Sequence, residues 1–355
     1  MKMGIAGLPQ CGRSTFFSLV AGKKGAVSQK GDKKVAVAQV KDKRLDNIHK
    51  YFSPVKKINA TVEFLLVPPL TKDPLDRRKA LSLMAEVNAV LLVVRAFKDE
   101  SVYHIDTTVD PLRDVQTLLD EMVLYDLEII ERRLQNIEKD LKRTKTDPLV
   151  KEKELLLNFQ KVLEEGTSLR KIELGEESEK MVRGFNFLTL KPLVILLNVA
   201  DSEMKESEIL KTVEVKFGSE NTGILSFCAT MEKEISELET EEEREAFLSD
   251  LGFDEPAIDR IIHASYETLG YISFFTIGDN EVRAWTVKKG ALAPQAAGTV
   301  HSDMERGFIR AEVIKFDDFM ELGGEQGCRK AGLAQLKGKD YIVQDGDIIN
   351  IRFNI

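Results

Sequence analysis

Glycine and hydroxyl residues with phosphate-binding spacing lie near the start of the chain. Gly7, Gly12 and Ser14 follow the pattern G-x-x-x-x-G-K-[ST], with Arg13 in the place of the lysine. In that pattern, backbone N–H groups and a helix N-terminus hold phosphate groups. Arginine keeps the charge of lysine but presents it as a planar fork. The loop therefore predicts a phosphate site with an altered cation; the alternative is a simple tight turn.

Short apolar runs are the elements that must position this loop. Residues 3–6 enter it as a buried strand, and a helix is expected from Ser14 onward. Further apolar runs lie at residues 35–40, 60–67, 89–94, 193–197 and 224–227. Short, almost uninterrupted apolar runs are typical of strands buried on both faces. The pattern predicts an α/β fold with a parallel or mixed sheet under helices.

An insertion of helical character separates the strands of this sheet. One helical seam has apolar residues spaced three and four apart, and a second has leucines spaced seven apart. The two seams are Leu127, Ile130, Leu134, Ile137 and Leu141, and then Leu149, Leu156 and Leu163. We expect an antiparallel helical hairpin that packs against itself. The mixed charges near its tip are typical of a solvated surface, with a weak nucleic-acid contact as the alternative.

The last part of the chain has a β-rich texture. Residues 272–277 and 282–287 flank a turn signal and predict a hairpin, as do residues 341–343 and 348–353. A helix is expected at residues 316–322 between them. Before this module, the acidic residues 232–245 predict a solvated helix capped by Thr240.

Composition bounds the class of protein. The chain has 355 residues, 43% of them hydrophobic, and a net charge of −8. This length predicts two or three domains, and the negative charge argues against a protein that coats nucleic acid through bulk charge. The three cysteines lie far apart, without the spacing of a metal site or a disulfide framework, which fits a reducing cytoplasm. No signal peptide or membrane-length apolar run is present, so we expect a cytoplasmic protein without a membrane partner.

Several long stretches carry a family resemblance more specific than the glycine loop. They are residues 93–99 (VVRAFKD), 281–286 (EVRAWT), 293–298 (APQAAG), 305–312 (ERGFIRAE) and 341–347 (YIVQDGD). Together with the loop, they identify the chain as similar to the YchF subfamily of Obg-like P-loop NTPases over essentially its full length.

The resemblance implies an architecture and an activity. It implies a P-loop G domain over residues 1–113 and 185–270, with an inserted helical coiled-coil arm over residues 114–184. A C-terminal TGS domain of β-grasp type is implied for residues 271–355. Members of the family are similar in binding ATP more readily than GTP, in hydrolysing it slowly and in associating with ribosomes.

The resemblance also implies the nucleotide contacts. Asn198 is expected to buttress the phosphate loop, Val199 to lie along the base and Asp201 to lie near the base edge. The family has glutamate where Asp201 stands, and aspartate is the choice of GTP-reading relatives, so the preference between ATP and GTP stays open. The implied contacts are Gly7, Gln10, Cys11, Gly12, Arg13, Ser14, Thr15, Asn198, Val199, Asp201, Cys228, Ala229 and Thr230. The alternative for Asn198 to Asp201 is a strand-end turn that caps the next helix.

The chain departs from the family where metal and terminal phosphate are handled. Leu66 replaces the aspartate that supports Mg²⁺, and Pro69 replaces the glycine whose N–H meets the γ-phosphate. Residues 28–33 lack the switch threonine, and the segment after Leu70 lacks the glycine-rich second switch. Only Ser14 remains as a candidate Mg²⁺ ligand. We therefore expect weak or Mg²⁺-independent nucleotide binding, no assigned catalytic residue and slow or absent hydrolysis.

Three functional hypotheses follow from these residues. The first is a degenerate P-loop NTPase homologue that binds ATP or GTP weakly and associates with ribosomes or RNA. The second is a nucleotide-independent ribosome- or RNA-binding adaptor, and the third is a competent ATPase or GTPase that uses unorthodox residues. Cys11, within the loop, is interpreted as a packing residue, with a redox-active thiol as the alternative.

Overall fold

The computed structural model describes residues 2–22, 28–30, 33–52, 56–144, 146–204, 207–219, 222–278 and 280–354. These residues form two compact units, the first from Met1–Val37 and Glu63–Ile261, the second from Ala38–Val62 and Ile262–Ile355. Residues 31 and 32 of the predicted threonine-free segment lie outside the described residues.

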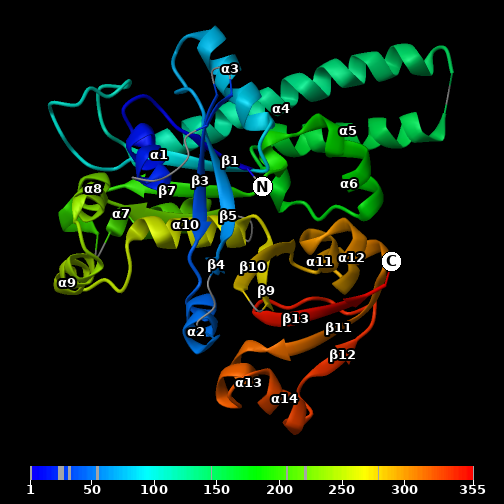
Figure 1. Cartoon of the computed structure of the whole chain (residues 1–355). Helices are drawn as coiled ribbons and strands as arrows, with labels where there is room; N and C mark the ends of the chain where they lie inside the picture. Colours follow the sequence, from blue (N-terminus) through cyan, green and yellow to red (C-terminus); the bar gives the residue numbers. More distant parts are fainter. Residues whose placement is uncertain are drawn as a thin grey trace. The chain divides into compact units, whose positions relative to one another are not determined.

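A mixed sheet forms the centre of the first unit (Figure 1). Within the described residues it has seven strands in the order β2-β3-β5-β1-β6-β7-β8. Their bounds are β1 (Lys2–Ala6), β2 (Ser28–Lys30), β3 (Lys33–Val40), β5 (Ala60–Leu66), β6 (Ala89–Arg95), β7 (Leu193–Asn198) and β8 (Thr222–Phe227). The run from β5 to β8 is parallel, whereas β2 pairs antiparallel with β3.

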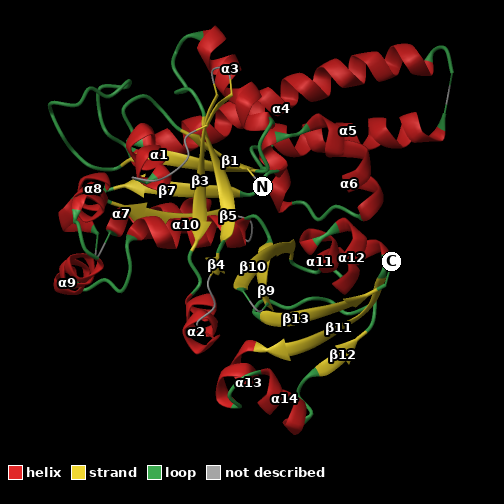
Figure 2. Cartoon of the chain, viewed as in Figure 1, coloured by secondary structure: helices red, strands yellow, loops and turns green. Residues whose placement is uncertain are grey.

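Helices cover both faces of this sheet (Figure 2). Its central strands β6 and β7 are therefore buried along their whole length. One apolar cluster joins the sheet to α3, α4 and α7. Helix α1 also packs against this sheet, because its Phe16 ring meets the rings of Phe64 in β5 and Phe227 in β8 edge-on. The helices of this unit are α1 (Arg13–Ala21), α3 (Pro74–Ala85), α4 (Pro111–Leu141), α5 (Asp147–Glu164), α6 (Glu176–Val182), α7 (Glu208–Phe217), α8 (Ala229–Glu237) and α9 (Glu241–Leu251). Helix α10 (Ala257–Thr268) begins in the first unit and ends in the second.

Helices α4 and α5 run side by side as an antiparallel pair (Figure 1). Buried apolar residues of both helices, among them Ile130, Ile137 and Leu156, share one cluster. Arg133 of α4 forms a bidentate pair with Glu152 of α5, with a shortest N–O distance of 2.7 Å. The apolar seams seen in the sequence therefore lie within this helix pair.

A second mixed sheet forms the centre of the second unit. Within the described residues it has six strands in the order β12-β11-β13-β9-β10-β4. Their bounds are β4 (Lys56–Ile58), β9 (Tyr271–Ile277), β10 (Glu281–Lys288), β11 (Phe308–Lys315), β12 (Gln335–Lys337) and β13 (Asp347–Phe353). The helices are α2 (Lys43–Phe52), α11 (Ala293–Val300), α12 (Ser302–Arg306), α13 (Phe316–Glu321) and α14 (Glu325–Ala331). Phe274, Ala297 and Val313 belong to its apolar core.

Most local predictions agree with these elements, and two do not. The expected α/β fold with a mixed sheet is confirmed, and the hairpin of residues 272–277 and 282–287 corresponds to β9 and β10. The second expected hairpin is wrong, because Ile342 makes only an isolated bridge to Leu292 while β13 pairs with β11 and β9. The acidic segment is also not uniformly solvated, because Glu232 is buried and accepts hydrogen bonds from the N–H groups of Ala257 and Ile258.

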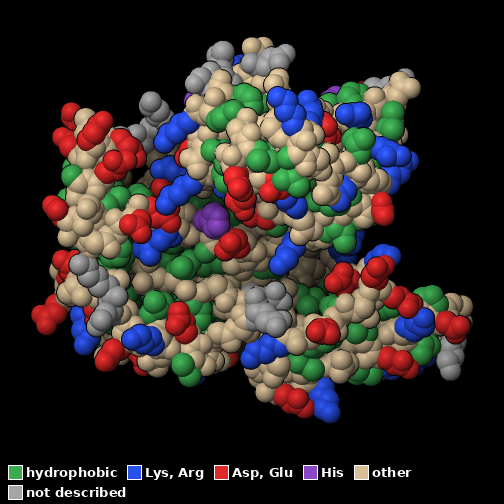
Figure 3. Space-filling model, turned by 90° about the horizontal axis from the view of Figure 1, so that it is seen from below, with side chains coloured by type: hydrophobic (Ala, Val, Ile, Leu, Met, Phe, Trp, Pro, Cys, Tyr) green, Lys and Arg blue, Asp and Glu red, His purple; other side chains and the backbone are tan. Residues whose placement is uncertain are grey.

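Surface charge and hydropathy agree with the composition. On the face seen in Figure 3, Lys and Arg side chains are interspersed with Asp and Glu side chains. Among the helices within the described residues, none combines the length and the apolar character needed to cross a membrane.

Candidate nucleotide site

The glycine loop connects the carboxyl end of β1 to the first turn of α1. Gly12 precedes the helix in a left-handed conformation, and its carbonyl accepts a hydrogen bond of 2.9 Å from the Phe16 N–H. The N–H groups of a helix's first turn have no intrahelical partner, and the helix dipole favours an anion beside them. Ser14 and Thr15 lie exposed in this turn. The predicted loop therefore has the geometry of an anion-binding helix N-terminus.

Two glycines are required by close approaches of other atoms. A Cβ on Gly7 would lie 2.4 Å from the Val93 carbonyl oxygen, and a Cβ on Gly12 would lie 2.3 Å from Asn198 Nδ2. Both glycines also have positive φ, 154° and 99°. Such contacts and dihedrals exclude an ordinary side chain. Gln10, with φ of 59°, adds a left-handed residue between them.

Arg13 is engaged with the backbone of its own unit. Its Nη1 donates to the carbonyl oxygen of Val67, the residue that follows β5. Its Nε is buried and has no hydrogen-bond partner among the described residues. Burial is the largest influence on the guanidinium and lowers its pKa. The side chain that takes the place of the phosphate-binding lysine is thus held by a protein carbonyl and is partly desolvated.

The segment after β5 is bonded to the strand and loop beside it. The Val67 N–H donates to the Ile5 carbonyl at 3.0 Å, and the Leu70 N–H donates to the Gly7 carbonyl at 3.1 Å. Pro68 and Pro69, between them, have no N–H to donate. With the Arg13 contact, three hydrogen bonds hold this short segment. These bonds hold the segment in place, whereas a loop that senses a nucleotide must be able to change its contacts.

Asn198 joins the glycine loop to the loop after β8. Its Nδ2 donates to the Cys11 carbonyl at 3.1 Å, and its Oδ1 accepts from the Ala229 N–H at 3.2 Å. The side chain is 3% exposed, so both ends of the amide are paired inside the protein. One buried amide thus fixes two of the three loops that the resemblance assigns to nucleotide binding. The same bond to Ala229 pairs an N–H in the first turn of α8, which follows β8, whereas the alternative interpretation predicts a cap on the helix that follows Asp201 itself.

The remaining predicted base contacts differ in their accessibility. Val199 is 1% exposed and packs in the core, so its side chain has no open face to lie along a base, unlike the implied position. Asp201 is exposed, and its Oδ1 accepts from the Ser202 N–H at 2.8 Å. Cys228 is buried with its Sγ 3.0 Å from the Oγ1 of exposed Thr230. Polar groups at 201 and 230 therefore remain open to a ligand.

Cys11 lies beneath the loop rather than at its surface. The residue is 2% exposed, and its Sγ lies within 2.8 Å of the position that a Cβ on Gly7 would take. Burial raises the pKa of the thiol to about 11. Because the thiolate is the reactive form, a buried neutral thiol is suited to packing and unsuited to redox chemistry.

The donor atoms around the loop do not fit an ordinary magnesium site. Mg²⁺ requires oxygen ligands in near-octahedral geometry, usually including one or two carboxylates. Ser14 offers a hydroxyl, but Leu66 offers no oxygen from its side chain at the end of β5. Ser14 thus stands as a magnesium ligand by prediction only.

One other group of potential metal ligands was missed by the sequence interpretation. Among the described residues, the side chains of His104, Asp106 and Asp114 are the group of three that converge, within 4.8 Å of one another. His104 Nε2 donates to Asp114 Oδ2 at 2.9 Å, while His104 Nδ1 accepts from the Asp106 N–H at 3.2 Å. Both ring nitrogens are therefore satisfied without a metal. Neither the spacing of these residues nor their neighbours in the sequence signals the buried pair.

Comparisons with known proteins place this geometry in a family. The family model YchF-GTPase_C, described as a protein of unknown function (DUF933), matches residues 271–354. A solved structure, "Structure of the Schizosaccharomyces pombe YchF GTPase", superposes with a TM-score of 0.86 at 27% identity. The match covers 99% of this chain and 97% of that one.

Curated relatives match along the whole chain. "Ribosome-binding ATPase YchF" of Bacillus subtilis is 38% identical over 367 residues, covering 100% of both sequences. The protein of the same name from Haemophilus ducreyi is 38% identical over 363 residues, covering 100% of this chain and 99% of that one. "Obg-like ATPase 1" of Oryza sativa is 34% identical over 370 residues, covering 100% of this chain and 92% of that one. The predicted resemblance is confirmed, and the chain belongs to the YchF family.

Proposed function

We propose that this chain is a translation-associated nucleotide-binding protein that binds ATP or GTP weakly, without depending on Mg²⁺, and hydrolyses it slowly or not at all. The observation that carries the proposal is the hydrogen bond from Arg13 to the Val67 carbonyl. It engages the cation of the phosphate loop and ties down the segment that would have to sense the terminal phosphate. The curated relatives' names, which include "ATPase", support nucleotide as the ligand.

Binding is supported by groups that do not depend on the altered side chains. The loop backbone and the first turn of α1 supply N–H donors whatever side chain follows Gly12. Asn198 holds the loop in position through the Cys11 carbonyl. Arginine also pairs with phosphate oxygens bidentately, provided that it leaves its present partner. A ligand must therefore compete with Val67 for Arg13, and this competition predicts weak binding.

Slow hydrolysis follows from the chemistry of phosphoryl transfer. That reaction depends on positioning and on neutralising charge with Mg²⁺ and a lysine. Losing one such electrostatic contact typically slows a reaction about a hundredfold or more. Here Arg13, Leu66 and Pro69 each alter one of these contacts, and all three act in the same direction. We propose no catalytic residue for this chain.

The choice of base rests on the exposed carboxylate of Asp201. Asn198 ends β7 and Asp201 follows three residues later, while Ala229 and Thr230 begin α8 just after the neighbouring parallel strand β8. Carboxyl ends of parallel strands form one edge of a sheet, where ligands of α/β proteins bind. Asp201 reaches the edge of a purine in this proposal, and both ATP and GTP are accepted candidates.

The proposed partners are ribosomes or RNA, and the proposed location is the cytoplasm. The relatives' name "Ribosome-binding ATPase YchF" supports the partner. We propose that α4 and α5 belong to a coiled-coil arm over residues 114–184 and that residues 271–355 form a TGS domain of β-grasp type. The shared apolar cluster of α4 and α5 supports the arm, and the mixed sheet of β9 to β13 supports the domain. Residues 1–113 and 185–270 then form the G domain.

Calorimetric titration tests the nucleotide proposal. ATP, ADP, GTP and GDP are titrated into the full chain, once with Mg²⁺ and once with a chelator. We expect dissociation constants that agree within about twofold between the two conditions and between tri- and diphosphate, because the residues that would read metal and γ-phosphate are altered. A parallel phosphate-release assay is expected to detect slow turnover or none. Turnover as fast as that of ordinary relatives, or much tighter binding of triphosphate, would contradict the proposal.

The same titration distinguishes the nucleotide-binding proposal from the hypothesis of a nucleotide-independent adaptor. Arg13 already has a carbonyl partner, which favours a loop that needs no nucleotide. An Arg13→Lys variant releases that carbonyl and restores the usual cation, so it is expected to bind nucleotide several-fold more tightly. Binding by neither the natural chain nor Arg13→Lys would favour the adaptor.

A further inference from the structure

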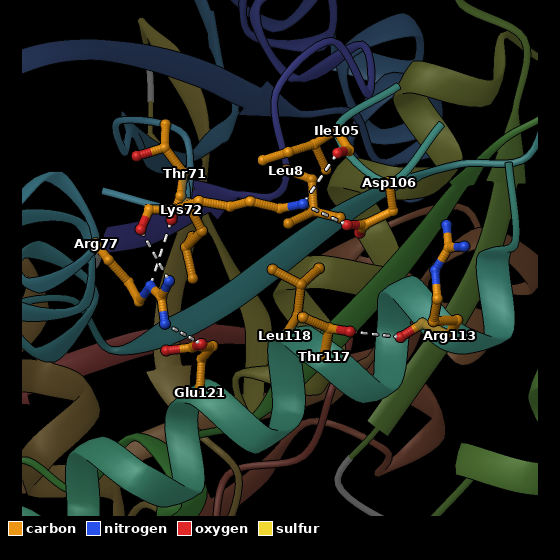
Figure 4. A pocket seen from close by; sticks show the side chains of 11 residues that line it. Leu8, Thr71, Lys72, Arg77, Ile105, Asp106, Arg113, Thr117, Leu118 and Glu121 are labelled. Carbon is orange, nitrogen blue, oxygen red and sulfur yellow. Dashed lines mark hydrogen bonds and ion pairs between the residues drawn. The ribbon is translucent and has the colours of Figure 1, made fainter. Parts of the chain in front are cut away.

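A cavity of about 310 Å³ lies beside the glycine loop, within the first unit (Figure 4). Leu8 of the loop lines it, together with Leu70, whose N–H is bonded to Gly7. Leu118 of α4 and Ile105 complete its apolar walls. Volumes of this order are typical of small-molecule sites, which combine apolar walls with a few polar groups.

Ion pairs stand at two ends of this cavity. At one end Arg77 of α3 pairs with Glu121 of α4 at 2.7 Å. At the other end Lys72 pairs with Asp106 at 2.9 Å and also donates to the Ile105 carbonyl at 3.2 Å. The stem of Lys72 runs along one side of the space, facing α4 (Figure 4). An occupant therefore meets apolar groups along its body and hydrogen-bonding groups at its ends.

Arg113 gives the lining its excess positive charge. Among the described lining residues there are three cations and two carboxylates, which leaves a net charge of +1. The carboxylate partner of Arg113 is Asp114, which is 2% exposed, does not line the cavity and is shared with His104. Arg113 makes four hydrogen bonds, to Thr108 and Asp114, and guanidinium has five N–H groups. Within the part of the chain that the structure describes, one Nη1 hydrogen of Arg113 therefore has no partner and is left for a ligand.

We propose that this cavity binds a small organic monoanion whose apolar body packs against Leu8, Leu70 and Leu118 and whose anionic group pairs with Arg113 and Lys72. The apolar walls select the body, and the net charge of the lining selects one negative charge. The site goes beyond nucleotide binding and does not rest on it. Because Leu8 belongs to the glycine loop, the occupant touches that loop directly.

A matched pair of ligands tests the site in the full chain. The probes are 4-phenylbutyrate, an arylalkyl carboxylate, and its neutral amide, titrated by ligand-observed NMR. The anion is expected to bind at least about threefold more tightly than the amide, the effect of one partly exposed charge contact. Thr117→Trp fills the cavity and is expected to abolish binding of both probes, with circular dichroism to check that the variant is folded.

A second variant keeps the test independent of packing. Lys72 has a side chain that is 70% exposed, so Lys72→Met changes charge without disturbing the core. It leaves Asp106 unpaired, and we expect it to weaken 4-phenylbutyrate about three- to fivefold while the amide changes less than twofold. Lys98→Met, an exposed lysine outside the lining, is the control and is expected to change neither. Equal binding of both probes, or equal effects of the two lysine variants, would overturn the proposal. Failure of nucleotide binding would leave it standing.

Discussion

The two sides of the glycine loop are built differently. On the side of β7 and β8, Asn198 donates to Cys11 and accepts from Ala229, so a buried amide holds the loop to its neighbour. On the side of β5, the segment from Leu66 to Leu70 is apolar and bonded to the loop through its own backbone. One side keeps polar groups in an arrangement suited to a ligand, and the other has backbone bonds where such groups would stand.

This difference shows which parts of a phosphate site depend on side chains. Backbone N–H groups at a helix N-terminus survive almost any substitution around them. Metal ligation and recognition of a terminal phosphate need specific carboxylates, hydroxyls and a free N–H. A chain can therefore keep the shape of a phosphate loop after it has lost the groups that make the loop a switch. Arg13 connects the glycine loop to the altered side, because it belongs to the loop but its side chain bonds to the segment after β5.

The largest expected effect comes from a substitution that disrupts the contact between the glycine loop and Asn198, on the side of β7 and β8. In Gly12→Ala, the new Cβ meets Asn198 Nδ2 at 2.3 Å in a backbone with φ of 99°. Left-handed strain costs about 1–2 kcal/mol, and a displaced buried amide costs about 1–3 kcal/mol more. We expect the free energy of unfolding to fall by about 3 kcal/mol in urea titrations and nucleotide binding to fall below detection.

Gly22→Ala is the matched control for this prediction. Gly22 ends α1 with φ of 61°, and among the described residues no atom beyond its chain neighbours and its own helix lies within 4 Å of the Cβ that a substitution would add. With ψ of 173°, its backbone lies in a region essentially restricted to glycine, so the substitution is expected to cost about 1–3 kcal/mol of stability from backbone strain alone and to leave nucleotide affinity unchanged. If Gly12→Ala behaves like Gly22→Ala, the contact with Asn198 does not order the loop.

Residue patterns predicted the fold wherever one period dominated a segment. The apolar runs at residues 89–94 and 193–197 became β6 and β7, because a strand buried on both faces has no polar positions. The Thr240 cap appeared as a full capping box with Glu243, because that signal is local. The hairpin expected at residues 341–343 failed because β13 found its partners in β11 and β9, far away in the sequence. Pairing partners of this kind are set by tertiary packing.

The candidate site was predictable in its backbone and less so in its side chains. The positions of Gly7 and Gly12 followed from spacing, because only glycine fits those dihedrals. The hydrogen bond from Arg13 to Val67 could not be predicted from the sequence. A long side chain can reach several carbonyl groups, and only the folded sheet determines which one it meets. The burial of Val199 was equally hidden, because one residue after a strand end can face either the core or the ligand. The pair of His104 and Asp114 has no motif at all.

A smaller effect is expected at the underside of the loop. With a pKa of about 11, about one Cys11 thiol in a thousand is ionised at pH 8, compared with about a quarter of free cysteine. We expect iodoacetamide to label Cys11 in the native chain about a hundredfold more slowly than in urea, as followed by peptide mass spectrometry. Because burial disfavours the thiolate, the native rate should rise about tenfold per pH unit up to pH 10. Fast labelling of the native chain at pH 8 would mean that Cys11 is accessible to solvent in the folded protein.

The smallest expected effect comes from adding a carboxylate to the side of β5. Leu66→Asp places a metal-binding group at the end of that strand, and Leu66→Asn is the control of equal shape without the charge. One carboxylate cannot supply the missing threonine or the N–H that Pro69 lacks, and the Arg13 bond to Val67 still holds the segment. We expect Mg²⁺ to tighten ATP binding by no more than about threefold in Leu66→Asp, the effect of about one exposed charge contact, and not at all in Leu66→Asn. Calorimetry with Mg²⁺ and with a chelator measures the difference. A rise of tens of fold that is confined to the triphosphate would mean that a single residue separates the two sides of the loop, rather than the whole segment from Leu66 to Leu70.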